Sequence, residues 1–90
     1  MAGPGPTVAD IATWSEVITR YDQEHFITYA RLLDAERDEA DWREAARIIL
    51  LRDPDKEPAE AWACWETHLA RAKWIATVGF QQATARANAH

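Results

Sequence analysis

The sequence has little cysteine and little glycine. Its 90 residues include 1 Cys, 3 Gly and 4 Pro. One cysteine excludes a disulfide within the chain and a zinc cluster built on cysteines. No apolar run approaches the roughly 18 residues that a membrane-spanning helix needs, and Met1–Pro6 lacks the basic and apolar regions of a secretory signal. We therefore expect a cytoplasmic protein without a membrane segment.

Basic residues are also scarce. The chain has 10 Lys and Arg against 15 Asp and Glu, a formal charge of −5. The acids concentrate in residues 34–66, which hold 11 of them, whereas residues 67–90 hold none. Non-specific binding to nucleic acid or anionic lipid needs an excess of cations, so this balance argues against both. A solvated acidic surface and a functional acidic face both remain open.

Alanine and tryptophan are abundant, with 18 Ala and 5 Trp. Alanine is the best helix former, and no alternating Val/Ile/Thr run predicts a strand. The length fits one domain. We predict a compact all-α domain of three to four helices over residues 8–80, with a disordered tail at 1–7 and a frayed tail at 81–90.

Apolar residues spaced three and four apart predict four helices, at about 8–20, 22–35, 42–52 and 58–78. Asp41 can cap the third helix. Pro54 interrupts the chain after it, and Pro58 suits the first turn of the fourth helix. Four tryptophans are expected to fill the core: Trp14, Trp42, Trp62 and Trp65.

Helices 42–52 and 58–78, joined by a proline-bounded turn, form a helix-turn-helix pattern, although most pairs with this pattern are ordinary helical hairpins. A DNA reader of this type carries Lys, Arg, Asn or Gln near the start of its second helix. This chain instead carries carboxylates there or just before: Asp55, Glu57, Glu60 and Glu66. Because carboxylates repel phosphates, we expect an acidic face in place of a DNA-reading surface. DNA binding through Arg43, Arg47 and Arg52 remains the alternative.

Catalytic motifs are missing. The three histidines have no metal-binding spacing, and no glycine-rich phosphate loop exists. Cys64 has no assignable base and is interpreted as a packing residue. We expect no enzyme activity, no metal and no cofactor.

Several runs together resemble a known family. They are Asp41–Leu50, Asp53-Pro54 with Pro58, His68–Ile75, and Gly79-Phe80. The resemblance covers about residues 20–82 and is to an extended-turn helix-turn-helix family, formerly a domain of unknown function, found in regulators of bacterial conjugative elements. That family includes two-domain activators and short single-domain antiactivators, and this chain is most similar to the latter.

The resemblance implies a protein partner. It implies an antiactivator that mimics the helix-turn-helix domain of a transcriptional activator of conjugative transfer and occupies its docking site. The implied partners are an FseA-type activator and, as a further candidate, a quorum-sensing activator of the TraR/LuxR type. No membrane and no small-molecule substrate are implied. An assembly subunit that forms a homo-oligomer is a third possibility.

Trp74 is the sharpest candidate for docking. It lies about 180° from Trp65 on an ideal helix, so it faces outward if Trp65 faces the core. Arg71 and Lys73 flank it, and Trp and Arg are favoured at interfaces. His68, Tyr29 and His25 lie at the edges of apolar stripes and are weaker candidates. The competing interpretation is that Trp74 packs beneath Phe80 or the first helix, and that His68 is a core histidine.

Overall fold

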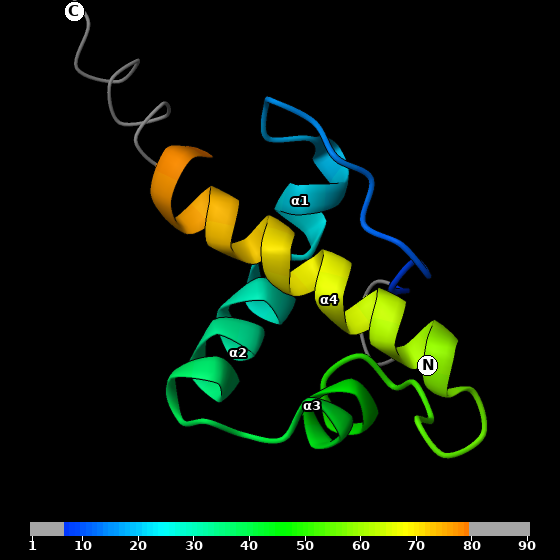
Figure 1. The fold of residues 1–90 in the computed structure, drawn as a ribbon. Helices are drawn as coiled ribbons and strands as arrows, with labels where there is room; N and C mark the ends of the chain where they lie inside the picture. Colours follow the sequence, from blue (N-terminus) through cyan, green and yellow to red (C-terminus); the bar gives the residue numbers. More distant parts are fainter. Residues whose placement is uncertain (1–6, 80–90) are drawn as a thin grey trace, which may run out of the picture.

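The computed structural model describes residues 7–79 as four α-helices and a π-helical turn, with no strand among these residues (Figure 1). The elements are α1 (Arg20–Glu24), α2 (Phe26–Arg37), α3 (Trp42–Ile48), α4 (Pro58–Trp74) and η1 (Ile75–Gly79). The predicted all-α class is confirmed. The predictions for Phe80 and for the tail at 81–90 lie outside the described residues, as does most of the predicted tail at 1–7.

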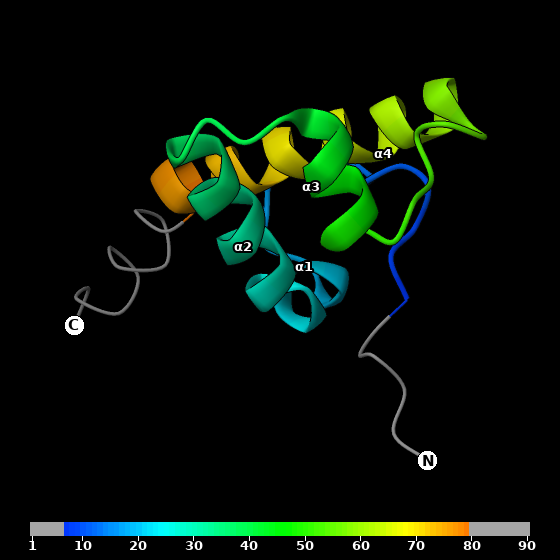
Figure 2. The same ribbon diagram turned by 90° about the horizontal axis from the view of Figure 1, so that it is seen from below.

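Helix α4 is the central element. It packs against both α2 and α3, and the segment before α1 runs along another side of it (Figures 1 and 2). The apolar core lies between these helices and contains Leu32, Ala45, Leu50, Cys64 and Leu69. Among residues 7–79, no helix is long and apolar enough to cross a bilayer.

The prediction of a helix at 8–20 is wrong, because residues 7–19 are irregular. We call this segment the N-terminal strap. The first helix begins only at Arg20, behind a capping box. The Asp22 N–H donates to Thr19 Oγ1 (3.2 Å), and the Thr19 N–H donates to the Asp22 carboxylate (2.8 Å). The pair satisfies two backbone donors at the helix start, which fixes the boundary there.

Backbone groups of the strap bond to side chains of α4 instead of to one another. The Ala12 N–H donates to Thr67 Oγ1 (3.1 Å), and Arg71 donates to the carbonyl oxygens of Ser15 and Val17. Each backbone polar group needs a partner, and a helix is only one way to provide it. Tertiary contacts thus override the helical spacing of the strap's apolar residues.

The other helices follow their local signals with two changes. The helix predicted at 22–35 is divided at His25 into α1 and α2. Asp41 caps α3 as predicted, accepting from the Arg43 N–H at 2.8 Å. That helix ends at Ile48 rather than 52, because Leu51 takes a left-handed conformation with φ 58°. Helix α4 starts at Pro58 as predicted, and the π-turn η1 carries it on to Gly79.

Candidate functional site

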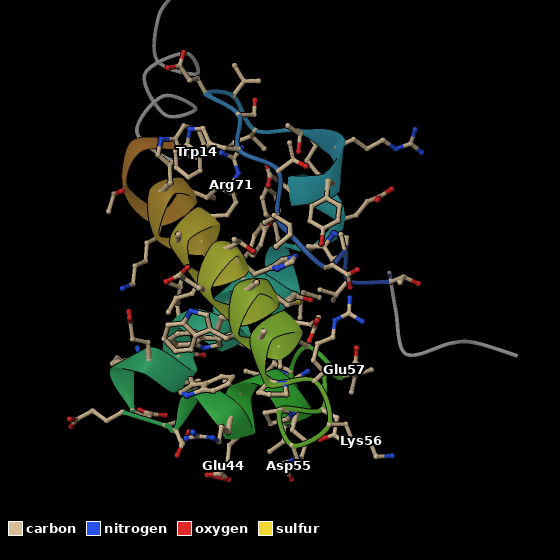
Figure 3. All side chains as sticks on the ribbon, turned by 45° about the vertical axis from the view of Figure 1, so that its right-hand side comes forward. Trp14, Glu44, Asp55, Lys56, Glu57 and Arg71 are labelled. Carbon is tan, nitrogen blue, oxygen red and sulfur yellow. The ribbon has the colours of Figure 1, made fainter. Side chains whose placement is uncertain are left out.

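Exposed carboxylates lie in the turn before α4 and along α4. Asp55, Glu57, Glu60 and Glu66 are all exposed, and we call them the acidic end. Figure 3 shows Asp55 and Glu57 at one end of the molecule, and Trp14 and Arg71 at the other. The structure thus leaves all four of these carboxylates in solvent.

The arginines of the DNA-binding alternative have partners within the chain. Arg47 pairs with Asp55 at 3.3 Å, and Arg52 pairs with Asp10 at 3.0 Å. Arg43 lies 3.9 Å from a carboxylate oxygen of Asp41, and its guanidinium also lies over the Trp42 ring. A phosphate would have to compete with these contacts, and it would approach a surface with excess carboxylates.

At the other end of α4, Arg71 forms a buried ion pair with Asp22. The Arg71 Nη2–Asp22 Oδ2 distance is 2.6 Å and the Nε–Oδ1 distance is 3.1 Å, so the contact is bidentate. The Tyr29 hydroxyl also donates to Asp22, at 2.9 Å. Burial by itself raises the pKa of Asp22, but hydrogen bonds from Arg71, Thr19 and Tyr29 outweigh it and lower that pKa to about 2.

The guanidinium of Arg71 is also enclosed by aromatic rings. Its central carbon lies 4.3 Å from the centre of the Trp74 ring and 5.2 Å from that of Trp14. The two indoles meet edge to face with their centres 5.6 Å apart. We call Trp14, Arg71 and Trp74 the tryptophan clamp. Cation–π contacts add to the ion pair, so the clamp fastens the strap to α4.

His68 and Cys64 form a second buried cluster on α4. The His68 Nδ1–H donates to the Cys64 carbonyl (2.7 Å), which leaves Nε2 to accept from the Tyr21 hydroxyl (2.6 Å). The Cys64 Sγ lies 3.7 Å from His68 Nδ1 and donates to the Ala9 carbonyl. Burial lowers the pKa of His68 and raises the pKa of the Cys64 thiol. A buried neutral thiol next to an imidazole already engaged on both nitrogens holds the strap and is poorly placed as a nucleophile.

His25 joins the strap to α1 in a similar way. Its ring stacks on Tyr21, with centres 3.9 Å apart. Its Nδ1 lies 2.7 Å from the Tyr21 carbonyl oxygen, and its Nε2 lies 3.1 Å from the Thr7 carbonyl oxygen. The ring therefore links the start of the strap to α1.

These contacts correct the predicted docking surface. Four of its six residues are buried: Arg71, His68, Tyr29 and His25. Their side chains hold the strap and Asp22 rather than facing a partner, because residues 7–19 cover that side of α4. Lys73 is exposed but pairs with Glu36 at 2.6 Å, and Trp74 is half-buried against Trp14.

The prediction that four tryptophans fill the core is also corrected. Trp14 is 55% exposed, and its position over Arg71 was missed because its spacing fitted a buried helical stripe. Trp62 is 41% exposed, and Trp42 and Trp65 are half-buried. These last three form an aromatic cluster at the α3–α4 contact, with ring centres 5.0–6.0 Å apart. The core is too thin to enclose such large side chains.

Within residues 7–79, no group of three or more His, Cys, Asp and Glu is placed to hold a metal ion. A scan of the chain against models of known families matches none, and a comparison with curated proteins finds no match.

Proposed function

We propose that this chain is a non-catalytic antiactivator. It binds a transcriptional activator of conjugative transfer in the cytoplasm and blocks it by mimicking the activator's helix-turn-helix domain. The observation that carries this proposal is the pair α3–α4, a helix-turn-helix whose exposed start bears carboxylates. A scaffold of this kind with an acidic reading face is better suited to a protein partner than to DNA.

The electrostatics support that choice. DNA affinity comes largely from counterion release when Lys and Arg neutralise phosphates. Here the arginines near the turn face carboxylates of the same chain. The identity of the partner rests on the sequence resemblance: an FseA-type activator first, and a TraR/LuxR-type activator second.

The exposed part of the tryptophan clamp is the proposed contact surface. Trp14 is half-exposed, Trp74 lies beside it, and the cationic Lys73 is on the same end of α4. Tryptophan is enriched among residues that dominate binding energy. The buried Arg71 acts here as a positioning residue, since it orients both rings.

The test is binding of the intact protein to the N-terminal domain of an FseA-type activator, by calorimetry. Trp14→Ala and Trp74→Ala are expected to weaken binding at least tenfold, provided that circular dichroism shows them folded. Trp62→Ala is the matched control, because Trp62 is an exposed tryptophan outside the clamp. Absence of binding by the wild-type protein contradicts the proposal.

Binding to duplex DNA distinguishes this proposal from the alternative, a DNA-binding regulator. An electrophoretic shift at low salt that is salt-sensitive and sequence-selective would favour a DNA-binding regulator instead. Substituting Arg43 and Arg47 should then abolish that shift.

A further inference from the structure

The two halves of the N-terminal strap are held by different kinds of groups. Residues 13–19 depend on Arg71, which donates to two carbonyl oxygens of that segment and keeps its charge at any ordinary pH. Residues 7–12, which we call the first half of the strap, depend instead on a series of hydrogen bonds that ends on His68. The first half is therefore fastened through a side chain of the type that titrates near neutral pH.

Both backbone groups of Ale9 take part in this series of bonds. The Ala9 N–H donates to the Tyr21 hydroxyl at 3.0 Å, and that hydroxyl donates in turn to His68 Nε2 at 2.6 Å. The Ala9 carbonyl oxygen accepts from the Cys64 thiol at 3.4 Å, and the Cys64 carbonyl oxygen accepts from His68 Nδ1 at 2.7 Å. The arrangement requires a neutral imidazole, because Nε2 has to accept a hydrogen bond.

A proton on Nε2 disturbs this arrangement in two ways. The ring then carries donors on both nitrogens, so the Tyr21 hydroxyl loses the acceptor for its own hydrogen. The ring also becomes a cation away from water, since His68 is 0% exposed. Ala9 bridges the two side chains that flank the ring, Tyr21 and Cys64, so movement of the first half of the strap away from α4 would let water reach the imidazolium.

The surroundings of His68 do not compensate a positive charge. Burial lowers its pKa, a hydrogen bond to the Cys64 backbone offsets part of that effect, and the charges of His25 and Arg52 lower the pKa further. The carboxylates of this region, Asp10 and Asp22, are each bound to an arginine. Titratable and charged groups face the ring from every element packed on it: Tyr21 and His25 of α1, Tyr29 of α2, Arg52 after α3, Cys64 of α4 and, through Arg52, Asp10 of the strap.

Arg52 and His25 oppose release of the first half. Arg52 donates to the Val8 carbonyl oxygen and pairs with the exposed Asp10, and an exposed pair of this kind contributes little. His25 Nε2 faces the Thr7 carbonyl oxygen, and its other nitrogen faces a second carbonyl oxygen. A neutral ring donates to only one of the two, so a proton on His25 would tighten its hold on the strap. Release in mild acid is therefore expected from His68 and not from His25.

We propose that His68 is a proton-sensitive switch for the strap. When Nε2 takes up a proton in mild acid, residues 7–12 leave α4, while residues 13–19 stay bound to Arg71. Release uncovers the part of α4 that carries Cys64 and Thr67. The tryptophan clamp involves only the second half of the strap and stays closed, and the inference does not depend on the antiactivator proposal.

The single cysteine reports the release, because Cys64 is 0% exposed and donates to the strap. Its labelling rate with a pyridyl disulfide is compared with that of the urea-unfolded protein at the same pH, which cancels the titration of the thiol itself. We expect this protection to fall at least about tenfold from pH 8 to pH 5, because the released form binds a proton near the ordinary pKa of 6.5 and the closed form does not. Local release should depend only weakly on added urea, unlike labelling through global unfolding.

Amide hydrogen exchange followed by NMR shows which residues are released. The amides of Ala9 and Ala12, both bound by side chains, should lose protection over the same pH range. The amide of Thr19, bound by the Asp22 carboxylate, should keep its protection. The ring signals of His68 should titrate where the protection is lost.

Variants assign the effect to one histidine. His68→Gln should keep the labelling protection within about twofold between pH 8 and pH 5, because glutamine does not titrate. His25→Gln is the matched control, since His25 is also buried and also touches the strap, and it should retain the full fall. Asp10→Asn should lower the protection equally at both pH values, because it weakens the hold of Arg52 without touching the switch.

Four results overturn the inference. They are equal protection of the wild type at pH 5 and pH 8, a fall that persists in His68→Gln or vanishes in His25→Gln, exchange of the Thr19 amide together with that of Ala9, and a urea dependence equal to that of global unfolding. If His68→Gln does not fold, the wild type decides, because a His68 ring that stays neutral while protection falls also overturns the inference.

Discussion

The two ends of α4 use charge in opposite ways. At its start, Glu57 and Glu60 are exposed to solvent. Towards its end, Arg71 is buried and bound to Asp22, with the strap packed over it. The carboxylates at the start are thus part of the surface, whereas the Arg71 guanidinium near the end is part of the interior. The comparison shows that the charge balance of a segment does not say which of its charges a partner can reach.

The first prediction concerns the buried end. Arg71→Ala leaves Asp22 buried without its cation, and breaking such a pair costs about 3–5 kcal/mol of folding stability. Urea unfolding followed by circular dichroism measures the loss. Lys73→Ala is the matched control, because the Lys73–Glu36 pair is exposed and should contribute about 1 kcal/mol or less.

A second variant serves as the test in case Arg71→Ala is too unstable to measure. Asp22→Asn combined with Arg71→Met removes both charges, so it should recover part of the stability lost in Arg71→Ala. Equal losses for Arg71→Ala and Lys73→Ala would show that the buried Arg71–Asp22 pair contributes no more to stability than the exposed Lys73–Glu36 pair.

The second prediction is a two-step dependence of stability on pH. The pKa of Asp22 is about 2 in the folded state, below its ordinary 3.8, so its contribution is present above about pH 4 and is lost as pH falls towards 2. The pKa of His68 is lowered by burial from 6.5, so the unfolded chain takes up that proton first. Stability should therefore also fall as pH drops below 6.5.

Urea unfolding between pH 2 and pH 8 measures both steps. His68→Gln should flatten the step below pH 6.5, and Asp22→Asn should flatten the step between about pH 4 and pH 2. Unchanged slopes in the two variants would assign the pH dependence to other groups.

The sequence predicts the elements whose signals are local. Asp41 and Pro58 lie next to the helices that they start, so the beginnings of α3 and α4 were correct. The strap was not predictable in this way. Its backbone partners, Thr67 and Arg71, lie more than 50 residues away in sequence, and Trp14 has the spacing of a helical stripe whether or not a helix forms.

The burial of four candidate site residues escaped prediction for a related reason. The helical projection places Trp74 opposite Trp65. A side chain that faces away from the core can still be covered by another segment of the chain. Residues 7–19 cover that side of α4, and no pattern in the sequence reports this. The acidic end was predictable, because carboxylates at the start of a helix, on the side away from its apolar stripe, remain in water unless another segment covers them.

The last prediction concerns the exposed end and has the smallest effect on stability. Replacing Glu57, Glu60 and Glu66 by Gln should change the free energy of unfolding by about 0.5 kcal/mol or less, because surface substitutions seldom do more. The same variant should bind duplex DNA more tightly at low salt, since three repulsive charges are lost. Fluorescence anisotropy with labelled duplex measures the gain.

The matched control removes three exposed acids elsewhere: Glu16→Gln, Asp38→Asn and Glu39→Gln. Both variants have the same net charge, so any difference in DNA affinity reports where the charges lie. A larger gain for the acidic-end variant means that these carboxylates keep phosphates away from the helix-turn-helix face. An equal gain means that only the net charge matters, and the acidic end then has no role beyond keeping the surface hydrated.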